Sequence, residues 1–309
     1  MATAPHIAAL VTRLEAASTA YYNGAPLIED SVFDALLLEL WRLDPTNAFI
    51  AKILAPDPSG WPKVTLPFVL GSLDKSVSDA DFDKWMATVP GCELAITRKL
   101  DGMSLLLKFV GGVLVQAMTR GDGVTGEDIT RNVRIMQGVP LTIPFEGTAY
   151  VRGEVIVTKS DFAKFFPNES NTRNTAGGTA KRQANYEKSR HLTVMCYNLT
   201  TSPNVTNTRK QEIYTMVDWG FKCTPVTATK SAAAVKTMRQ DFINGLRAAL
   251  DYDIDGLVIE VNDSAAFEAM GKSGMNPLGA TAFKFDPESG VTTLLGVDWQ
   301  VGKSGRVTP

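Results

Sequence analysis

The tetrapeptide Lys99-Leu100-Asp101-Gly102 places a lysine at the end of one strand-like segment and before the next. A lysine in such a position is a candidate nucleophile, and the glycine would let the backbone approach a bound nucleotide. The amine must lose its proton before it attacks, which costs about 4 kcal/mol near neutral pH unless burial or neighbouring cations lower that cost. Arg98 and Arg120 are such cations and would also attract a phosphate. Taken alone, the tetrapeptide is more often a surface turn.

Three further charged residues accompany strand patterns. Glu154 lies in a segment rich in valine and isoleucine, Asp255 precedes an apolar run, and Lys284 lies between two phenylalanines. Burial of Lys284 without an anionic partner would be costly. Each of the two carboxylates alone is more often part of a turn or a salt bridge. Together with Lys99 and Lys284, their order along the chain favours a functional site.

Two segments are suited to phosphate. Residues 159–190 hold seven basic side chains against three acidic ones, around the small residues Thr175–Thr179. Residues Gly121–Gly126 fit the GxGxxG pattern of dinucleotide-binding folds. The hairpin before this pattern and the lack of βαβ alternation after it disfavour a Rossmann dehydrogenase. The glycines would still free backbone amides to approach a phosphate.

The elements that position these residues begin with helices. Apolar residues recur at helical spacing over residues 7–17 and 33–41, which predicts a helical hairpin over residues 1–48. Four prolines between Pro56 and Pro67 predict a linker, and a capped helix is expected at residues 78–89.

Beyond residue 92 the pattern changes to strands joined by short turns. The expected strands are residues 94–98, 103–109, 113–119, 150–157, 192–199, 256–261, 282–285 and 293–301, and the expected helices are residues 161–166, 208–219 and 232–250. Gly111-Gly112 predicts a tight hairpin. We therefore expect an α+β fold, in which a domain of antiparallel sheets carries a small N-terminal helical subdomain.

Composition restricts the class of protein. The 309 residues are 44% hydrophobic and 21% charged, which disfavours disorder and coiled coil. No apolar run is long enough to span a bilayer, and three scattered cysteines predict neither a disulfide framework nor a zinc site. The cytoplasm is the expected compartment. A net charge of −2 argues against a domain that grips nucleic acid by bulk positive charge.

In their order along the chain, these motifs resemble those of the NAD-dependent DNA ligases, from about residue 17 to residue 309. The most specific stretch is Lys99–Gly102 followed by Thr119–Gly123 and Gly126–Asp128. The segments that are similar to later motifs of the family are Arg152–Val155, Asn171–Asn174, Ile254–Gly256 and Phe283–Phe285.

The resemblance implies a nucleotidyltransferase domain of the ATP-grasp-like ligase type. Lys99 would attack the α-phosphorus of NAD, release nicotinamide mononucleotide (NMN) and retain AMP as a phosphoramidate. AMP would then pass to the 5′-phosphate of nicked double-stranded DNA, and the 3′-hydroxyl would displace it. Positioning and positive charge are what such a transfer requires. The resemblance also implies Mg²⁺ or Mn²⁺, without assigned ligands, and a monomer with no membrane partner.

The resemblance also assigns roles to individual residues. The expected catalytic residues are Lys99, Asp101, Glu154, Asp255 and Lys284. The residues expected to bind the nucleotide are Ser72, Leu73, Arg120, Glu154, Arg173, Tyr197, Arg247 and Lys284, with Tyr197 stacking on adenine.

The N-terminal helices resemble the module that grips NMN in this family. The expected contacts are Tyr21, Tyr22, Asp30 and Asp34. Acids and aromatic faces suit the cationic pyridinium of NMN. The alternative is that Asp30 and Asp34 cap a helix and that Tyr21 packs on it.

Several residues depart from the family pattern. Tyr22 replaces the usual histidine, Phe33 a tyrosine, Thr97 an acid and Glu260 a lysine, and one residue is inserted in the basic stretch. Because an anion near phosphates is unfavourable, either Glu260 faces elsewhere while Lys284 and Arg247 compensate, or activity is impaired. These departures predict a divergent member of the family and suggest a viral source.

We expect residues 1–66 to form the NMN-binding subdomain and linker, residues 67–292 the adenylation domain, and residues 293–309 the start of an OB-fold whose remainder is missing. Two other activities stay open. One is an ATP- or GTP-using ligase or capping enzyme, which shares the KxDG tetrapeptide. The other is a catalytically impaired nucleotide- or DNA-binding module.

Overall fold

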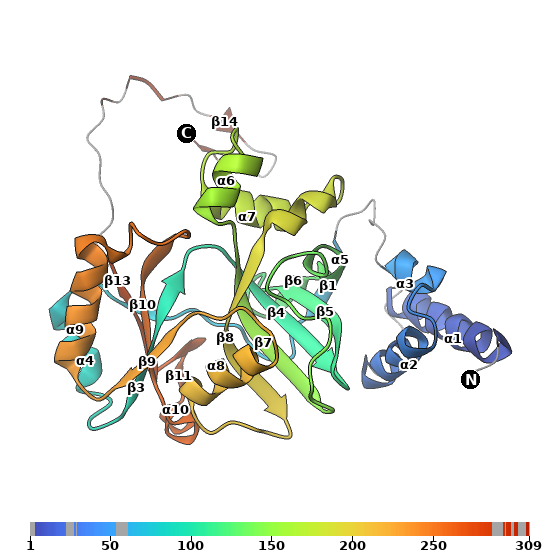
Figure 1. Ribbon diagram of the computed structural model, residues 1–309, viewed down its shortest axis with the longest axis horizontal. Coiled ribbons are helices and arrows are strands. Elements are labelled where there is room, and N and C mark those ends of the chain that lie inside the picture. Colours follow the sequence, from blue (N-terminus) through green and yellow to red (C-terminus); the bar gives the residue numbers. More distant parts are fainter. Residues whose placement is uncertain are drawn as a thin grey trace.

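A small group of helices precedes two β-sheets in the chain (Figure 1). The computed structural model describes residues 4–22, 28, 30–53, 61–285, 293, 295–297, 300–301 and 307–308. The first helices are α1 (Ala4–Tyr22), α2 (Asp30–Leu43) and α3 (Ala48–Ile53). They enclose a core of their own, made of Leu10, Leu14, Leu36, Leu40, Phe49 and Ile50. The helical hairpin predicted for residues 1–48 is therefore present.

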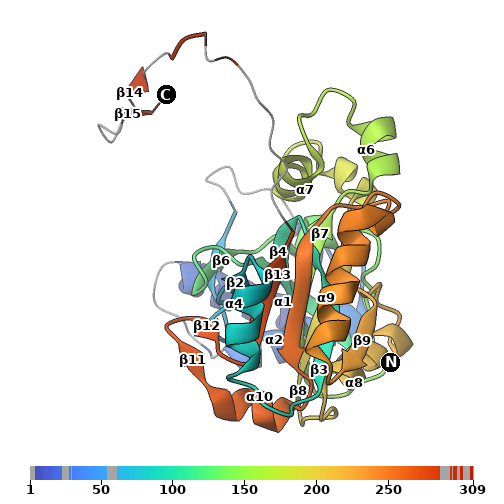
Figure 2. The ribbon, with the colours of Figure 1, turned by 90° about the vertical axis from the view of Figure 1, so that its left-hand side faces the viewer.

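The first large sheet has five strands in the order β2-β13-β10-β3-β9. Their bounds are Asp74–Ser76 (β2), Ala280–Lys284 (β13), Ile254–Val261 (β10), Leu94–Leu100 (β3) and Val226–Thr229 (β9). All neighbours are antiparallel except β2 and β13, which are parallel. Helices α4 (Asp79–Met86) and α9 (Ala232–Asp241) cover one face of this sheet, where Phe82 and Val235 join its buried core (Figure 2).

The second large sheet has four antiparallel strands in the order β5-β4-β7-β8. Their bounds are Val113–Thr119 (β5), Met103–Val110 (β4), Thr148–Ile156 (β7) and Thr193–Ser202 (β8). Gly111 and Gly112 join β4 to β5 with φ angles of 54° and 79°, which confirms the predicted hairpin. Two antiparallel sheets with flanking helices confirm the expected α+β fold.

The remaining elements are short. The helices are α5 (Thr130–Val133), α6 (Lys159–Phe165), α7 (Thr172–Ala180), α8 (Arg209–Asp218) and α10 (Ser264–Met270), with a 3₁₀ turn at Tyr186–His191 and a π turn at Phe242–Leu246. The two-stranded pairs are β1 (Lys63–Thr65) with β6 (Thr125–Glu127), β11 (Lys272–Ser273) with β12 (Asn276–Pro277), and β14 (Gln300–Val301) with β15 (Val307–Thr308). Across the described residues, no helix combines the length and apolar character needed to cross a bilayer.

Two expected elements differ from the structure. The helix predicted for residues 232–250 ends at Asp241, and the chain continues as a π turn in which Gly245 has a φ of 151°. Only glycine adopts that conformation readily, so it interrupts the helix. Of the strand expected at residues 293–301, the structure describes strand conformation at Gln300–Val301.

Candidate active site

Lys99 lies near the end of β3, beside the start of β10 and the end of β13. Gly256 of β10 is in register with Lys99 on one side and with Lys284 on the other. A Cβ atom on Gly256 would lie 2.5 Å from the carbonyl oxygen of Phe283, so a larger residue would not fit. The two lysines therefore flank a single glycine, on the same face of the sheet.

The carboxylate of Asp255 joins these two lysines. Its Oδ1 lies 3.0 Å from Nζ of Lys99, and its Oδ2 lies 2.9 Å from Nζ of Lys284. Burial raises the pKa of Asp255, but hydrogen bonds from Lys284 and Lys99 outweigh this effect and leave the pKa below its usual value. Asp255 is thus the anionic partner that a lysine inside an aromatic strand requires.

The turn after Lys99 packs tightly against β7. A Cβ atom on Gly102 would lie 2.2 Å from the carbonyl oxygen of Val155, so Gly102 permits the backbone to approach β7. This close contact brings Asp101 near Glu154. The guanidinium of Arg173, in α7, lies 3.0 Å from Oδ1 of Asp101. Three predicted site residues from separate elements are therefore gathered beside the nucleophile candidate.

Glu154 has the most unusual carboxyl group of the site. Burial raises its pKa to about 7, although Lys99 and Arg173 act to lower it. Near neutral pH this carboxyl is therefore present in both its protonated and its ionised form, whereas Asp255 stays ionised. Perturbed carboxyl groups of this kind are common in active sites.

Four of the residues expected to bind the nucleotide come from three separate segments. Nη1 of Arg120 donates a hydrogen bond of 3.3 Å to Oγ of Ser72, and Leu73 packs against the core of the five-stranded sheet. Tyr197 of β8 contacts the cores of both large sheets, and its hydroxyl lies 3.3 Å from Oγ of Ser104. Burial raises the pKa of Tyr197. Its position between the sheets is compatible with stacking on a base.

Arg247 lies beyond the π turn, at the edge of the site. Its guanidinium lies 5.6 Å from the ring centroid of Phe285, the residue that follows Lys284. The aromatic contact holds Arg247 close to the end of β13.

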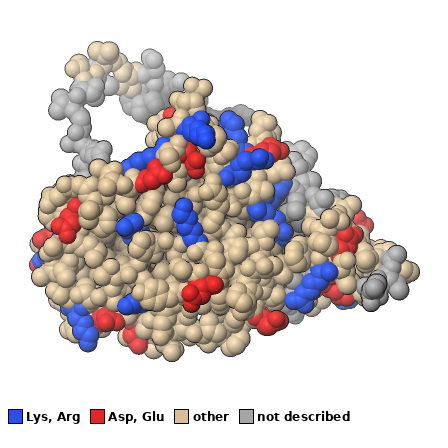
Figure 3. Space-filling view, in the orientation of Figure 1, with Lys and Arg blue, Asp and Glu red and all other residues tan. Residues whose placement is uncertain are grey.

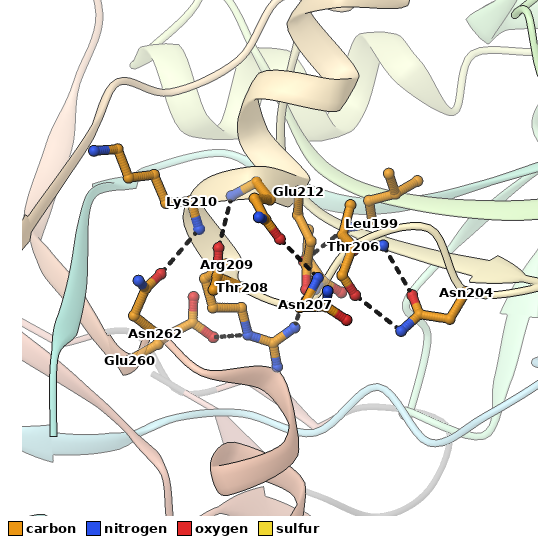
Figure 4. Close-up of polar contacts among 12 residues, drawn as sticks. Leu199, Asn204, Thr206, Asn207, Thr208, Arg209, Lys210, Glu212, Glu260 and Asn262 are labelled. Atoms are coloured by element: carbon orange, nitrogen blue, oxygen red, sulfur yellow. Dashed lines mark hydrogen bonds and ion pairs between the residues drawn. The ribbon is translucent and has the colours of Figure 1, made fainter.

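Glu260 belongs to a different cluster (Figure 4). It lies four residues after Gly256, about 13 Å along β10. Its Oε1 lies 3.8 Å from Nε of Arg209, whose Nη1 lies 2.7 Å from Oε1 of Glu212. The Arg209 guanidinium also lies 4.1 Å from the ring centroid of Phe267. Because Glu260 pairs with Arg209, away from Lys99, we favour the alternative in which Glu260 faces away from the phosphates.

The basic stretch of residues 159–190 forms α6, α7 and the 3₁₀ turn. Acidic and basic side chains are interspersed around α6 and α7 (Figure 3). Besides Arg173 with Asp101, ion pairs here include Lys159 with Asp253 at 3.5 Å, Lys181 with Glu127 at 3.8 Å and Arg182 with Glu169 at 2.9 Å. Much of the local positive charge is therefore compensated within the protein.

The residues expected to contact NMN lie on the N-terminal helices α1 and α2. Tyr21 and Tyr22 end α1, Asp30 begins α2 and Asp34 lies within it. The side chains of all four lie outside the described residues. Nor do the described residues contain a group of three or more His, Cys, Asp or Glu side chains able to hold a metal ion.

Sequence reasoning missed a loop that holds the site together. Asp251, Tyr252 and Asp253 directly precede Ile254 and Asp255. The carboxylates of Asp251 and Asp253 bind α6 and α7, and the hydroxyl of Tyr252 accepts a hydrogen bond from Arg98. The alternation of acids at 251, 253 and 255 is a signal in the sequence that could have drawn attention to this loop.

Comparison with known proteins gives one matching family model and many sequence relatives. The model described as the NAD-dependent DNA ligase adenylation domain matches residues 59–288. A DNA ligase of Sorangium cellulosum is 36% identical over 97% of this chain and 48% of that protein. DNA ligase 1 of Nocardia farcinica is 35% identical over 97% of this chain and 47% of that protein. The chain thus spans about half the length of the curated relatives it matches.

Solved structures give weaker similarities. A structure of Lig E DNA ligases has a TM-score of 0.42 and 11% identity, and covers 71% of this chain and 69% of its own. The ATP-dependent DNA ligase from bacteriophage T7, in complex with ATP, has a TM-score of 0.40 and 13% identity over 77% of this chain and 79% of its own. These scores are too low to assign a function.

Proposed function

Because the chain belongs to the family of NAD-dependent DNA ligase adenylation domains, we propose that it transfers AMP from NAD to Lys99 and then to the 5′-phosphate of nicked double-stranded DNA. The observation that carries this proposal is the single carboxylate, Asp255, that holds both Lys99 and Lys284 on one face of a sheet. A nucleophile and a second cation at this spacing suit transfer of a phosphoryl group.

In the first step, Nζ of Lys99 attacks the α-phosphorus of NAD. The new bond is N–P, the bond that breaks joins the α-phosphorus to the bridging oxygen, and NMN leaves with that oxygen. Lys284, 2.9 Å from Asp255, and Arg173, 3.0 Å from Asp101, are cations of this site that would balance the charge on the phosphate oxygens. The proton of Nζ must leave, and Asp255 and Glu154 are the carboxyl groups beside it.

A divalent metal would fit this site if the phosphates of the substrate supplied some of its ligands. Mg²⁺ usually takes one or two carboxylates and completes its shell with phosphate oxygens and water. Asp255 is paired with two lysines and Asp101 with Arg173, so Glu154 is the carboxylate of the site that would be most available to Mg²⁺ or Mn²⁺. Such an ion would supply positive charge at the phosphates.

We also propose that the protein acts as a monomer in the cytoplasm.

The helices α1 and α2 are the proposed binding module for the NMN half of NAD, through Tyr21, Tyr22, Asp30 and Asp34. Residue types support this assignment, since acids and aromatic rings attract a pyridinium cation. The adenosine half would lie between the large sheets, with Tyr197 against the base and Ser72, Leu73, Arg120 and Arg247 around it.

Intact-mass spectrometry after incubation with NAD and Mg²⁺ tests the proposal. The wild-type protein should gain the mass of one AMP, and Lys99→Ala should gain none. Parallel incubations with ATP and GTP distinguish a ligase or capping enzyme that uses those nucleotides. Adenylation of Lys99→Ala, or reaction with ATP in preference to NAD, would overturn the proposed reaction.

A further inference from the structure

We propose that Asp253 is a positioning residue that docks α6 and α7 onto the turn after Lys99 and thereby holds Arg173 over the reacting phosphate. This inference rests on the proposed function and concerns a residue outside the expected site. Asp253 lies in the loop that leads into β10, two residues before Asp255.

The carboxylate of Asp253 contacts the first residue of both helices. Its Oδ2 accepts a hydrogen bond of 2.6 Å from Oγ1 of Thr172, the first residue of α7. Its Oδ1 lies 3.5 Å from Nζ of Lys159, the first residue of α6. One side chain therefore ties together two helices that are far from it in sequence.

The backbone of the same residue holds the turn after the nucleophile. The amide of Asp101 donates a hydrogen bond of 3.1 Å to the carbonyl oxygen of Asp253. Asp101 in turn pairs with Arg173, which directly follows Thr172. The contacts thus close a ring from Asp253 through Thr172, Arg173 and Asp101 back to Asp253. Displacement of any member would change where the Arg173 guanidinium lies relative to Lys99.

Neighbouring residues keep the loop in place. The carboxylate of Asp251 accepts hydrogen bonds of 2.9 Å and 2.6 Å from the backbone amide and the hydroxyl of Ser160, at the start of α6. Ile254 is fully buried in the core of the five-stranded sheet. Because Asp255 follows at once, the same short loop sets the position of Arg173 and of the carboxylate that holds the two lysines.

The side chain of Arg173 is more exposed to solvent than the carboxylates that hold it in place. The side chain of Arg173 is 62% exposed, whereas that of Asp101 is 28% exposed and that of Asp253 is 33% exposed. Arg173 is therefore open to a substrate while the residues around it are held by the protein. A long, exposed arginine side chain loses conformational entropy when it binds a substrate. Because the backbone of Arg173 is already held in place, this entropy loss on binding is smaller.

The test compares variants that remove or retain the acceptor for Thr172. Asp253→Ala and Thr172→Val each break the contact, and the rate of AMP addition from NAD should fall about tenfold in each, since small displacements of positioning groups have effects of this size or larger. Asp253→Asn and Thr172→Ser retain an acceptor or a donor and should recover most of the rate. Asp263→Ala is the matched control, because it removes the carboxylate cap of α10 at Ala266, outside the site.

The Arg173→Ala background distinguishes positioning from general stability. If Asp253 acts through Arg173, adding Asp253→Ala to Arg173→Ala should slow AMP addition by less than twofold more. Losses that multiply in the double variant, or wild-type rates in both Asp253→Ala and Thr172→Val, would overturn the inference. A wild-type protein that gains no AMP would reject the proposed function itself, and with it any role of Asp253 in that reaction.

Discussion

Two carboxyl groups in this site have pKa values displaced in opposite directions. Hydrogen bonds from Lys284 and Lys99 keep the pKa of Asp255 low against the effect of burial, whereas burial raises the pKa of Glu154 to about 7. The difference arises because Asp255 has two direct cationic partners. Asp255 therefore remains an anion that orients lysines, while Glu154 changes charge in the range where the protein would work.

The raised pKa of Glu154 predicts a stability effect that depends on pH. From pH 4.5 to about 7 the unfolded protein releases this proton while the folded protein retains it, so the stability that the protonated group contributes is lost as pH rises. Glu154→Gln does not undergo this loss. We expect the variant to match the wild type near pH 4 and to exceed its free energy of unfolding by at most about 3 kcal/mol at pH 8.

Urea denaturation at both pH values measures this difference, and AMP addition from NAD should fall in the same variant. Glu146→Gln, at an exposed carboxylate, is the control for the loss of one surface charge. An equal stability difference at pH 4 and pH 8 for Glu154→Gln would contradict the burial argument. Gain of stability with loss of activity is typical of a residue placed for function.

Residue types and order predicted which charged residues would meet, but not all of their partners. Lys284 in an aromatic strand required an anion, and the structure supplies Asp255. The sequence alone did not show how an anion is accommodated at Glu260, because its partner Arg209 is on α8, far from Glu260 in the sequence. Pairings between elements distant in sequence depend on how the sheets pack, which local patterns do not encode.

At the scale of elements, the β11–β12 pair supports the segment that carries Ser72. Nδ2 of Asn276 donates a hydrogen bond of 2.7 Å to Oδ1 of Asp74, and Sδ of Met275 would lie 3.7 Å from a Cβ atom on Gly123. Met275 thus lies between the segment before Ser72 and the glycine turn after Arg120. These are the two segments joined by the hydrogen bond from Arg120 to Ser72.

Gly71→Ala should disturb this support. A Cβ atom there would lie 1.7 Å from the carbonyl oxygen of Met275, so either the β11–β12 pair or the Ser72 segment must move. Overpacking of this kind typically costs about 1–3 kcal/mol, and a shift of Ser72 should raise the KM for NAD in AMP addition. Gly296→Ala is the control, since its Cβ would meet no atom of the described residues within 4 Å. If the KM for NAD is unchanged in Gly71→Ala, the β11–β12 pair has no role in nucleotide binding.

Sequence patterns predicted the type of most elements, because alternation and turn residues act locally. The glycine hairpin between β4 and β5 followed directly from Gly111-Gly112. The end of α9 did not, since a helical pattern continues past Asp241 and a single glycine at 245 redirects the chain. The parallel pairing of β2 with β13 also joins segments far apart in sequence, which periodicity does not report.

At the scale of the whole molecule, the N-terminal helices and the sheets have separate cores. The helical core contains Leu14 and Leu40, and the sheet cores contain residues such as Leu105 and Ile96. Nη2 of Arg42 in α2 donates a hydrogen bond of 3.2 Å to the carbonyl oxygen of Gly111, at the tip of the β4–β5 hairpin. The helices therefore lie beside the β4–β5 hairpin (Figure 1), while their core is separate from both sheet cores.

This separation predicts that Leu40→Ala affects the helices alone. Leu40 is fully buried in the helical core, and its truncation should cost about 2–5 kcal/mol there while the sheets keep their stability. Hydrogen exchange should accelerate in residues 4–53 and stay slow in β3, β4 and β5. If these helices hold the NMN half of NAD, AMP addition should fall strongly although the sheets remain folded. Leu105→Ala is the reverse control, since it empties a sheet core and leaves the helical core intact. If hydrogen exchange in the helices of Leu40→Ala is fast but the rate of AMP addition equals that of the wild type, the helices have no role in the reaction.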